Sequence, residues 1–173
     1  GQREPFVVKY PRKIPAGTLV HTPVMGIDIM PTVAALTDGK LPNHPIDGKN
    51  VMQVLSGESQ ESPQEAYFFY YRVNELFGVR YRDWKMYFPH RYRTMAGQPQ
   101  GADGLPGQYA FIDMKEIELY HLPTDEAERT NVAQFHPDVV NKIQSLAADM
   151  RLKLGDALLD QTGSETRTAG SLK

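Results

Sequence analysis

The chain has 173 residues and a mass of 19.5 kDa, with 40% hydrophobic and 23% charged residues, a formal net charge of −2 and no cysteine. This ordinary globular composition excludes collagen-like, low-complexity and highly charged disordered chains. The near-neutral charge gives no electrostatic basis for binding nucleic acid or an anionic membrane. No apolar run approaches the ~20 residues that span a bilayer. Without cysteine there is no disulfide, thiol nucleophile or thiolate metal ligand.

The first apolar segment is Phe6–Tyr10, which lies between Pro5 and Pro11. Such a run is typical of a buried strand, and a buried parallel strand needs neighbours on both sides. We therefore expect the chain to start at a cut through a larger protein. The alternative is a short edge strand of a small domain.

Two helices are expected in the first third of the chain. The first covers residues 28–38, with Asp28 at its positive end and Pro31 in its first turn, where proline is tolerated. A shorter helix is expected over residues 50–55. The polar stretch 58–64 follows and is the best candidate for a boundary between subdomains.

From residue 65 onward, short runs rich in aromatic and β-branched residues suit a half-buried sheet. Strands are expected over residues 66–71, 76–81, 84–88 and 116–121. Their aromatic side chains could form a stacking platform for sugars or bases, but packing into a core is favoured because a helix is expected to cover the sheet. The Gly- and Pro-rich segment 89–108 is expected to be a loop, either functional or partly disordered.

The last expected element is a long helix. Pro137 suits the first helical position and Asp138 the positive helix end. The apolar residues that follow recur at helical spacing and form a stripe that can pack on a sheet. They are Val139, Val140, Ile143, Leu146, Ala147, Met150 and Leu154.

Together these elements predict an α+β fold. A small antiparallel sheet of three to four strands is packed by the long C-terminal helix, and a strand–helix remnant of a larger α/β domain precedes it. We expect residues 1–61 to be the tail of that larger domain and residues 62–160 to be the sheet-and-helix subdomain. Residues 161–173 are small and polar and are expected to form a disordered tail.

The sequence lacks the common motifs of catalysis and metal binding. It contains no phosphate-cradling Gly-rich loop, nucleophile elbow, paired-histidine zinc helix or EF-hand loop. Its five histidines are scattered, and no hydroxyl residue stands beside a recognisable base. We therefore assign no catalytic and no metal-binding residue within this chain.

One cluster of residues points to anion binding. His90, Arg91 and Arg93 lie close together where the strand over 84–88 leaves the sheet. Arginine offers a fork of donors and histidine a switchable one, which suits a sulfate, phosphate or carboxylate group. The alternative is that both arginines are simply solvated and His90 caps a turn.

Five segments in the same order resemble stretches of the sulfatase family, arylsulfatase A-like enzymes in particular. They are Gly1–Thr18 (Gly-x-Arg-x-Pro, an apolar run, then Pro-x-Gly), Ile27–Thr32 (Ile-Asp-Ile-x-Pro-Thr), Ile46–Gly48 (Asp-Gly), Gly78–Lys85 (Gly-Val-Arg, then Trp-Lys) and Glu118–Asp125 (Glu-Leu-Tyr, then Leu-x-x-Asp). The resemblance extends to about residue 157. Tyr10, Arg12 and His121 stand where the family usually has Trp, Gly and Asp.

The resemblance implies a parent enzyme that hydrolyses sulfate esters of carbohydrates or aryl alcohols. Its formylglycine nucleophile and its calcium ion would lie in an N-terminal catalytic domain, before Gly1. This chain would be the C-terminal portion, inactive alone, partnered by that domain and shaping the pocket for a sulfated small molecule or glycan. His90, Arg91 and Arg93 are its candidate substrate-binding residues. The family implies a periplasmic, extracellular or lysosomal location.

Two alternatives to this reading stay open. The chain could be a stand-alone, non-catalytic module that binds sulfated glycans. It could also be part of a phosphate or phosphonate ester hydrolase of the wider alkaline phosphatase superfamily.

Overall fold

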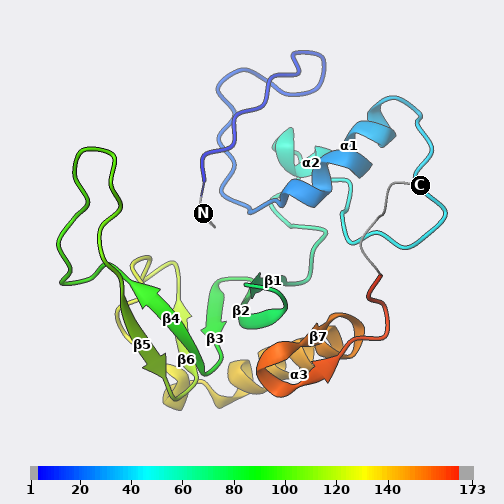
Figure 1. Cartoon of the computed structure of the whole chain (residues 1–173). Coiled ribbons are helices and arrows are strands. Elements are labelled where there is room, and N and C mark those ends of the chain that lie inside the picture. Colours follow the sequence, from blue (N-terminus) through cyan, green and yellow to red (C-terminus); the bar gives the residue numbers. More distant parts are fainter. Residues whose placement is uncertain (1–3, 168–173) are drawn as a thin grey trace, which may run out of the picture. The chain divides into compact units, whose positions relative to one another are not determined.

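The computed structural model describes residues 4–167 and divides into two compact units. The first unit ends at Glu65 and the second begins at Ala66, whereas the sequence analysis places the division after residue 61. Each unit is described by itself (Figure 1). The first unit contains the 3-10 turn η1 (Gly26–Asp28) and the helices α1 (Ile29–Leu36) and α2 (Met52–Leu55).

A buried carboxylate organises the first unit. Asp28 is fully buried and accepts hydrogen bonds from the backbone N–H of Met25 at 2.8 Å and of Lys49 at 2.9 Å. The side-chain amide of Gln64 donates to the same carboxylate at 2.9 Å. Asp28 therefore ties three loop segments to the start of α1, and its charge is balanced by donors, as a buried charge requires.

The expected strand over residues 6–10 does not form. This segment has no strand partner, and Val7 is 90% and Phe6 52% exposed. A strand needs a neighbour for its backbone N–H and C=O groups, and the first unit contains no strand among residues 4–65. The prediction, which was based on local apolar composition, was therefore wrong, because residues 4–65 supply no second strand with which residues 6–10 could pair.

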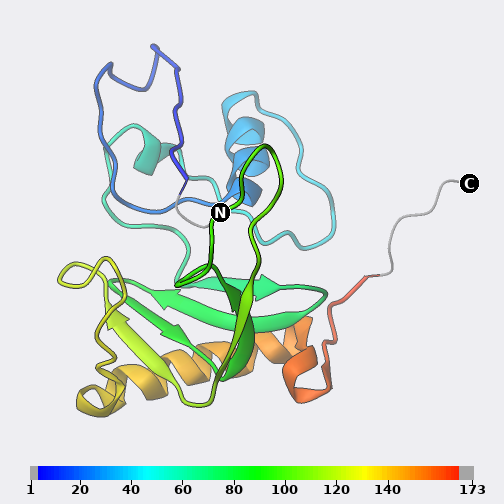
Figure 2. The ribbon, with the colours of Figure 1, turned by 60° about the vertical axis from the view of Figure 1, so that its left-hand side comes forward.

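The second unit confirms the expected α+β architecture. Its four-stranded antiparallel sheet has the order β1-β2-β3-β6. The strands are β1 (Tyr67–Tyr71), β2 (Glu75–Tyr81), β3 (Trp84–Tyr87) and β6 (Glu118–His121), and the helices are η2 (Ala133–Phe135) and α3 (Pro137–Leu154). Figure 2 shows α3 lying along one face of this sheet. Among residues 4–167 no helix is both long and apolar enough to cross a bilayer.

The core lies between the sheet and α3. Val79, Met86 and Leu119 are register partners across three neighbouring strands, and all three are fully buried. Ile143 and Ala147 of α3 are also fully buried and belong to the same cluster. Side chains alternate along a strand. The neighbours of these residues on the same strand, such as Lys85 and Tyr87 beside Met86, therefore point to the opposite face of the sheet.

The segment predicted to be a loop over residues 89–108 begins with a strand, which is the first strand of a hairpin. β4 (His90–Thr94) pairs antiparallel with β5 (Ala110–Met114) as a separate two-stranded sheet. The glycines and prolines that indicated a loop are concentrated in the connection between these strands. The loop prediction was therefore wrong for the first part of the segment, where the residues have the alternation of a strand.

Part of the expected disordered tail is folded. Beyond α3, β7 (Gly155–Asp156) and the turn η3 (Ala157–Leu159) lead into β8 (Gln161–Thr162), which pairs with β7. Gly155 ends α3 with a φ of +82°, and a Cβ there would lie 2.5 Å from the Gln161 carbonyl oxygen, so only glycine fits. Residues 168–173 lie outside the described part of the chain.

A second buried carboxylate joins α3 to the sheet. Asp156 is fully buried and accepts hydrogen bonds from Arg151 Nε at 2.8 Å and from the backbone N–H of Leu76 at 3.2 Å. The hydroxyl of Tyr70 donates to the neighbouring Gly155 carbonyl at 2.9 Å. Burial, together with the negative charge of Asp156, raises the pKa of Tyr70 to about 12, so this hydroxyl stays a donor at neutral pH.

We predict that Asp156→Asn lowers the free energy of unfolding by about 3 kcal/mol, because it leaves the half-buried Arg151 guanidinium without its anion. Urea unfolding monitored by circular dichroism measures this loss. Asp160→Asn removes the same charge from an exposed position and should change stability by less than about 0.5 kcal/mol. Equal effects of the two variants would show that the buried ion pair does not hold the helix to the sheet.

Candidate functional site

The sheet face opposite α3 carries a buried ion pair. Lys85 of β3 is only 7% exposed, and its Nζ lies 2.7 Å from Glu128 Oε1. The hydroxyl of Tyr87 donates to the other oxygen of Glu128 at 2.8 Å. The Lys85 ammonium also lies over the rings of Phe69 and Tyr87, 5.4 Å and 4.8 Å from their centroids. This lysine is therefore enclosed by one carboxylate and two aromatic faces.

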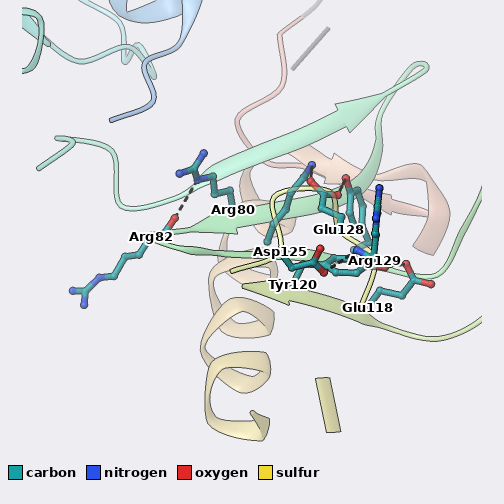
Figure 3. Close-up of polar contacts among 9 residues, drawn as sticks. Arg80, Arg82, Glu118, Tyr120, Asp125, Glu128 and Arg129 are labelled. Atoms are coloured by element: carbon teal, nitrogen blue, oxygen red, sulfur yellow. Dashed lines mark hydrogen bonds and ion pairs between the residues drawn. The ribbon is translucent and has the colours of Figure 1, made fainter. Parts of the chain in front are cut away.

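A second carboxylate extends this polar cluster. Tyr120 donates to Glu118 Oε2 at 2.6 Å, the contact drawn beside Glu128 in Figure 3. Burial and the neighbouring carboxylates raise the pKa values of both Tyr87 and Tyr120 well above the ordinary value for tyrosine. Both hydroxyls therefore stay protonated and donate at neutral pH.

The contacts of this cluster are those of a structural clamp. Among residues 4–167 no buried side-chain nitrogen or oxygen lacks a hydrogen-bond partner, so its groups are already occupied. Glu128 has a φ of +54°, and the nearby Asp125 carboxylate accepts from the backbone N–H of Arg129 and of Thr130, both at 2.8 Å. The ion pair thus fastens a tightly turned loop onto the sheet.

His90, a predicted site residue, lies against the four-stranded sheet. Its ring stacks on Phe77 with the centroids 3.8 Å apart, and its Nδ1 lies 2.6 Å from the Phe88 carbonyl oxygen. Because a carbonyl oxygen only accepts, Nδ1 carries the proton. Tyr92 and Tyr71 extend the row of rings on either side, with Tyr92 5.6 Å from His90 and Tyr71 5.4 Å from Phe77. His90 therefore links the hairpin to the sheet.

Arg91 and Arg93, the other two predicted residues, lie together on the opposite face of β4. The Arg91 guanidinium lies over the Phe111 ring at 4.7 Å, and that of Arg93 over the Tyr109 ring at 4.6 Å. Arg91 also lies 3.9 Å from Asp113, with both side chains more than half exposed. Strand alternation thus separates the histidine from the two arginines, which the sequence alone placed in one group.

The two arginines line a hollow of about 610 Å³, which we call the arginine hollow. Its lining comprises Tyr70, Tyr71, Arg72, Arg91, Tyr92, Arg93 and Phe111. Sequence reasoning missed Arg72, which follows β1 and carries no local motif. The stacking of His90 on Phe77 brings the hairpin next to the four-stranded sheet, which Arg72 follows. No local sequence pattern predicts this contact.

The chemistry available in the arginine hollow is that of anion binding. Three guanidinium groups supply forked N–H donors that match the oxygens of sulfate, phosphate or carboxylate. Within residues 4–167 no three histidine or acidic side chains gather where they could hold a metal ion. The calcium site implied by the family resemblance stays a prediction about a preceding domain.

Two family models match the chain. One describes the C-terminal region of aryl-sulfatase and covers residues 62–169. The other describes the C-terminal part of N-sulphoglucosamine sulphohydrolase and covers residues 1–95. Each spans more than half of the chain, and they overlap in the first strands of the sheet.

Individual relatives agree with these models. Steryl-sulfatase of Mus musculus is 35% identical over 60% of this chain and 17% of its own length. Arylsulfatase A of Homo sapiens is 30% identical over 84% of this chain and 30% of its own length. A protein solved with its substrate, D-glucosamine-2-N,6-O-disulfate, shares the fold with a TM-score of 0.55 and 19% identity, over 83% of this chain and 27% of its own. The chain thus spans less than a third of each relative.

We predict that Glu128→Gln lowers the free energy of unfolding by about 3 kcal/mol, because it leaves the buried Lys85 ammonium without its carboxylate partner. The matched control is Glu75→Gln, which breaks the more exposed pair of Glu75 with Arg72 at 3.5 Å and should cost less than about 1 kcal/mol. Urea unfolding at neutral pH compares the two. A loss for Glu128→Gln that stays within the control's range would contradict the clamp.

Proposed function

This chain belongs to the sulfatase family, whose C-terminal region it matches, and from that premise we propose that the complete protein hydrolyses sulfate esters of a carbohydrate or an aryl alcohol. The names of the relatives support this reaction class. They are steryl-sulfatase, arylsulfatase A and arylsulfatase D. Because the chain covers only 17% and 30% of the first two, the activity is proposed for the protein that contains it.

We propose that this chain supports the structure and shapes the substrate pocket, without supplying the reacting groups. It contains no cysteine, and its candidate site offers arginine donors and aromatic rings. The nucleophile, a formylglycine, and the calcium ion would come from an N-terminal catalytic domain of the same protein. Those groups would supply a nucleophile and a positive charge that stabilises the sulfate oxygens.

The observation that carries the proposed role is the pairing of Arg91 and Arg93 on one exposed strand face. Each guanidinium is held over an aromatic ring, which orients its N–H groups before a ligand arrives. We propose that both arginines contact the substrate. His90 acts as a positioning residue, because it fixes the start of β4 to Phe77 and to the Phe88 carbonyl.

We predict that the complete protein hydrolyses 4-nitrophenyl sulfate in the presence of calcium, and that the 173-residue chain alone does not. Release of 4-nitrophenol measures the rate, and an aldehyde-reactive probe should label the complete protein. Faster hydrolysis of 4-nitrophenyl phosphate would favour the phosphate or phosphonate ester alternative. Binding of sulfated glycan without hydrolysis would favour the stand-alone binding module.

We further predict that Arg91→Gln and Arg93→Gln each raise KM for a sulfated saccharide roughly tenfold, equivalent to about 1.4 kcal/mol, with a smaller change in kcat. His90→Ala should raise KM less, because it loosens the hairpin without removing a donor. Arg129→Gln removes an exposed arginine from another loop and serves as the control. If Arg91→Gln and Arg93→Gln gave the same KM as Arg129→Gln, the two arginines would not contact the substrate, and the hairpin would have a structural role only.

A further inference from the structure

We infer that the arginine hollow is a binding site for a sulfated saccharide, in which Arg72, Arg91 and Arg93 together hold a sulfate group of that ligand. The sugar ring lies against the exposed aromatic side chains of the same hollow. This inference rests on the proposed function and deepens it, because it names the ligand class and adds a third arginine.

The hollow is built from two separate sheets. Arg72 stands in the turn after β1 with a φ of +52°, and Arg91 and Arg93 stand on β4 of the hairpin. The stacked rings of Phe77 and His90 hold these elements together. Three arginines that are distant in the sequence are therefore brought to one cavity by a rigid aromatic contact, as a preorganised site requires.

The positive charge of the hollow is available to a ligand. Arg93 has no ion pair among residues 4–167 and rests only on the Tyr109 ring. Arg91 and Arg72 have carboxylate neighbours at 3.9 Å and 3.5 Å, but these arginine side chains are 61% and 47% exposed. Such loose, solvated pairs contribute little, so an incoming sulfate can compete for both guanidinium groups.

The aromatic lining argues for a sugar beside the anion. Tyr71 is 47%, Tyr92 36% and Phe111 54% exposed, so part of each aromatic side chain is open to solvent in the hollow that the arginines line. Aromatic side chains pair an apolar face with, in tyrosine, a polar tip. The volume of about 610 Å³ lies within the usual range of small-molecule sites, about 300–1,000 Å³. A sulfated sugar offers both an apolar ring face and a permanent charge.

The donors of the hollow are suited to binding a ligand and not to reacting with it. Guanidinium groups donate and do not act as bases, because they stay protonated. The hydroxyl of Tyr70, which also lines the hollow, is already engaged with the Gly155 carbonyl. The arginines of the hollow would therefore hold a sulfate without supplying a base or a nucleophile.

The test is protection of individual arginines in the complete protein from modification by phenylglyoxal, measured by peptide mapping and mass spectrometry. The probe is D-glucosamine-2-N,6-O-disulfate, with N-acetylglucosamine and inorganic sulfate at equal ionic strength as comparisons. Arg82, labelled in Figure 3, is the internal reference. It is exposed, has a φ of +53° in the turn at the other end of β2, and is not among the residues that line the hollow. We expect the disulfated sugar to slow modification of Arg72, Arg91 and Arg93 at least threefold and to leave Arg82 unchanged.

Variants sharpen the result. Arg72→Gln should reduce the protection of Arg91 and Arg93 at least threefold, whereas Arg82→Gln should not. Absent protection, equal protection of Arg82, or equal protection by inorganic sulfate would overturn the saccharide site. Because the readout does not need turnover, protection in a protein that hydrolyses no sulfate ester would keep the site and reject the proposed hydrolysis. Hydrolysis of a sulfate ester without protection of the arginines would support the proposed function and reject the saccharide site.

Discussion

The stacking of His90 on Phe77 is the contact on which the candidate site depends. The hairpin β4–β5 shares no backbone ladder with the four-stranded sheet, so its position relative to that sheet is set by its short connections to β3 and β6 and by side-chain contacts. A ring separation of 3.8 Å and the bond from Nδ1 to the Phe88 carbonyl fix the first residue of β4. Arg91 and Arg93 follow His90 on the same strand, so the position of His90 helps to set where both arginine side chains lie.

Two ion-paired carboxylates, the buried Asp156 and the partly buried Glu128, tie neighbouring elements to the sheet. Asp156 binds α3 to β2 from one side, and Glu128 holds a loop on the other face through Lys85. A buried ion pair contributes little net stability when both partners are present, yet it strongly penalises any arrangement that separates them. These pairs therefore favour one packing of helix, sheet and loop over alternatives that apolar contacts alone would tolerate.

The sequence predicted the parts of this unit that are locally encoded. The stripe on α3 was predicted from helical periodicity, and the four strands β1, β2, β3 and β6 from runs rich in aromatic and β-branched residues. The structure contains all five elements. The sequence did not predict the hairpin, because the glycines and prolines of its connection masked the flanking strands. It predicted a strand over residues 6–10 from composition, although pairing depends on a neighbour that residues 4–65 do not supply.

The candidate site shows the same division. Arg91 and Arg93 could be selected from their residue types and their closeness in the sequence, although the segment was predicted to be a loop. In the observed strand β4 they share a face because they are two residues apart. Arg72 could not, because it reaches the hollow only through contacts between distant segments. His90 was selected with the arginines, and the structure assigns it the opposite face of β4.

That separation decides which charged groups line the hollow. His90 stacks on Phe77 and contacts the Phe88 carbonyl oxygen, and it is not among the residues of the lining. Arginine keeps its charge throughout. The guanidinium groups that line the hollow therefore carry the same positive charge in neutral and in acidic surroundings.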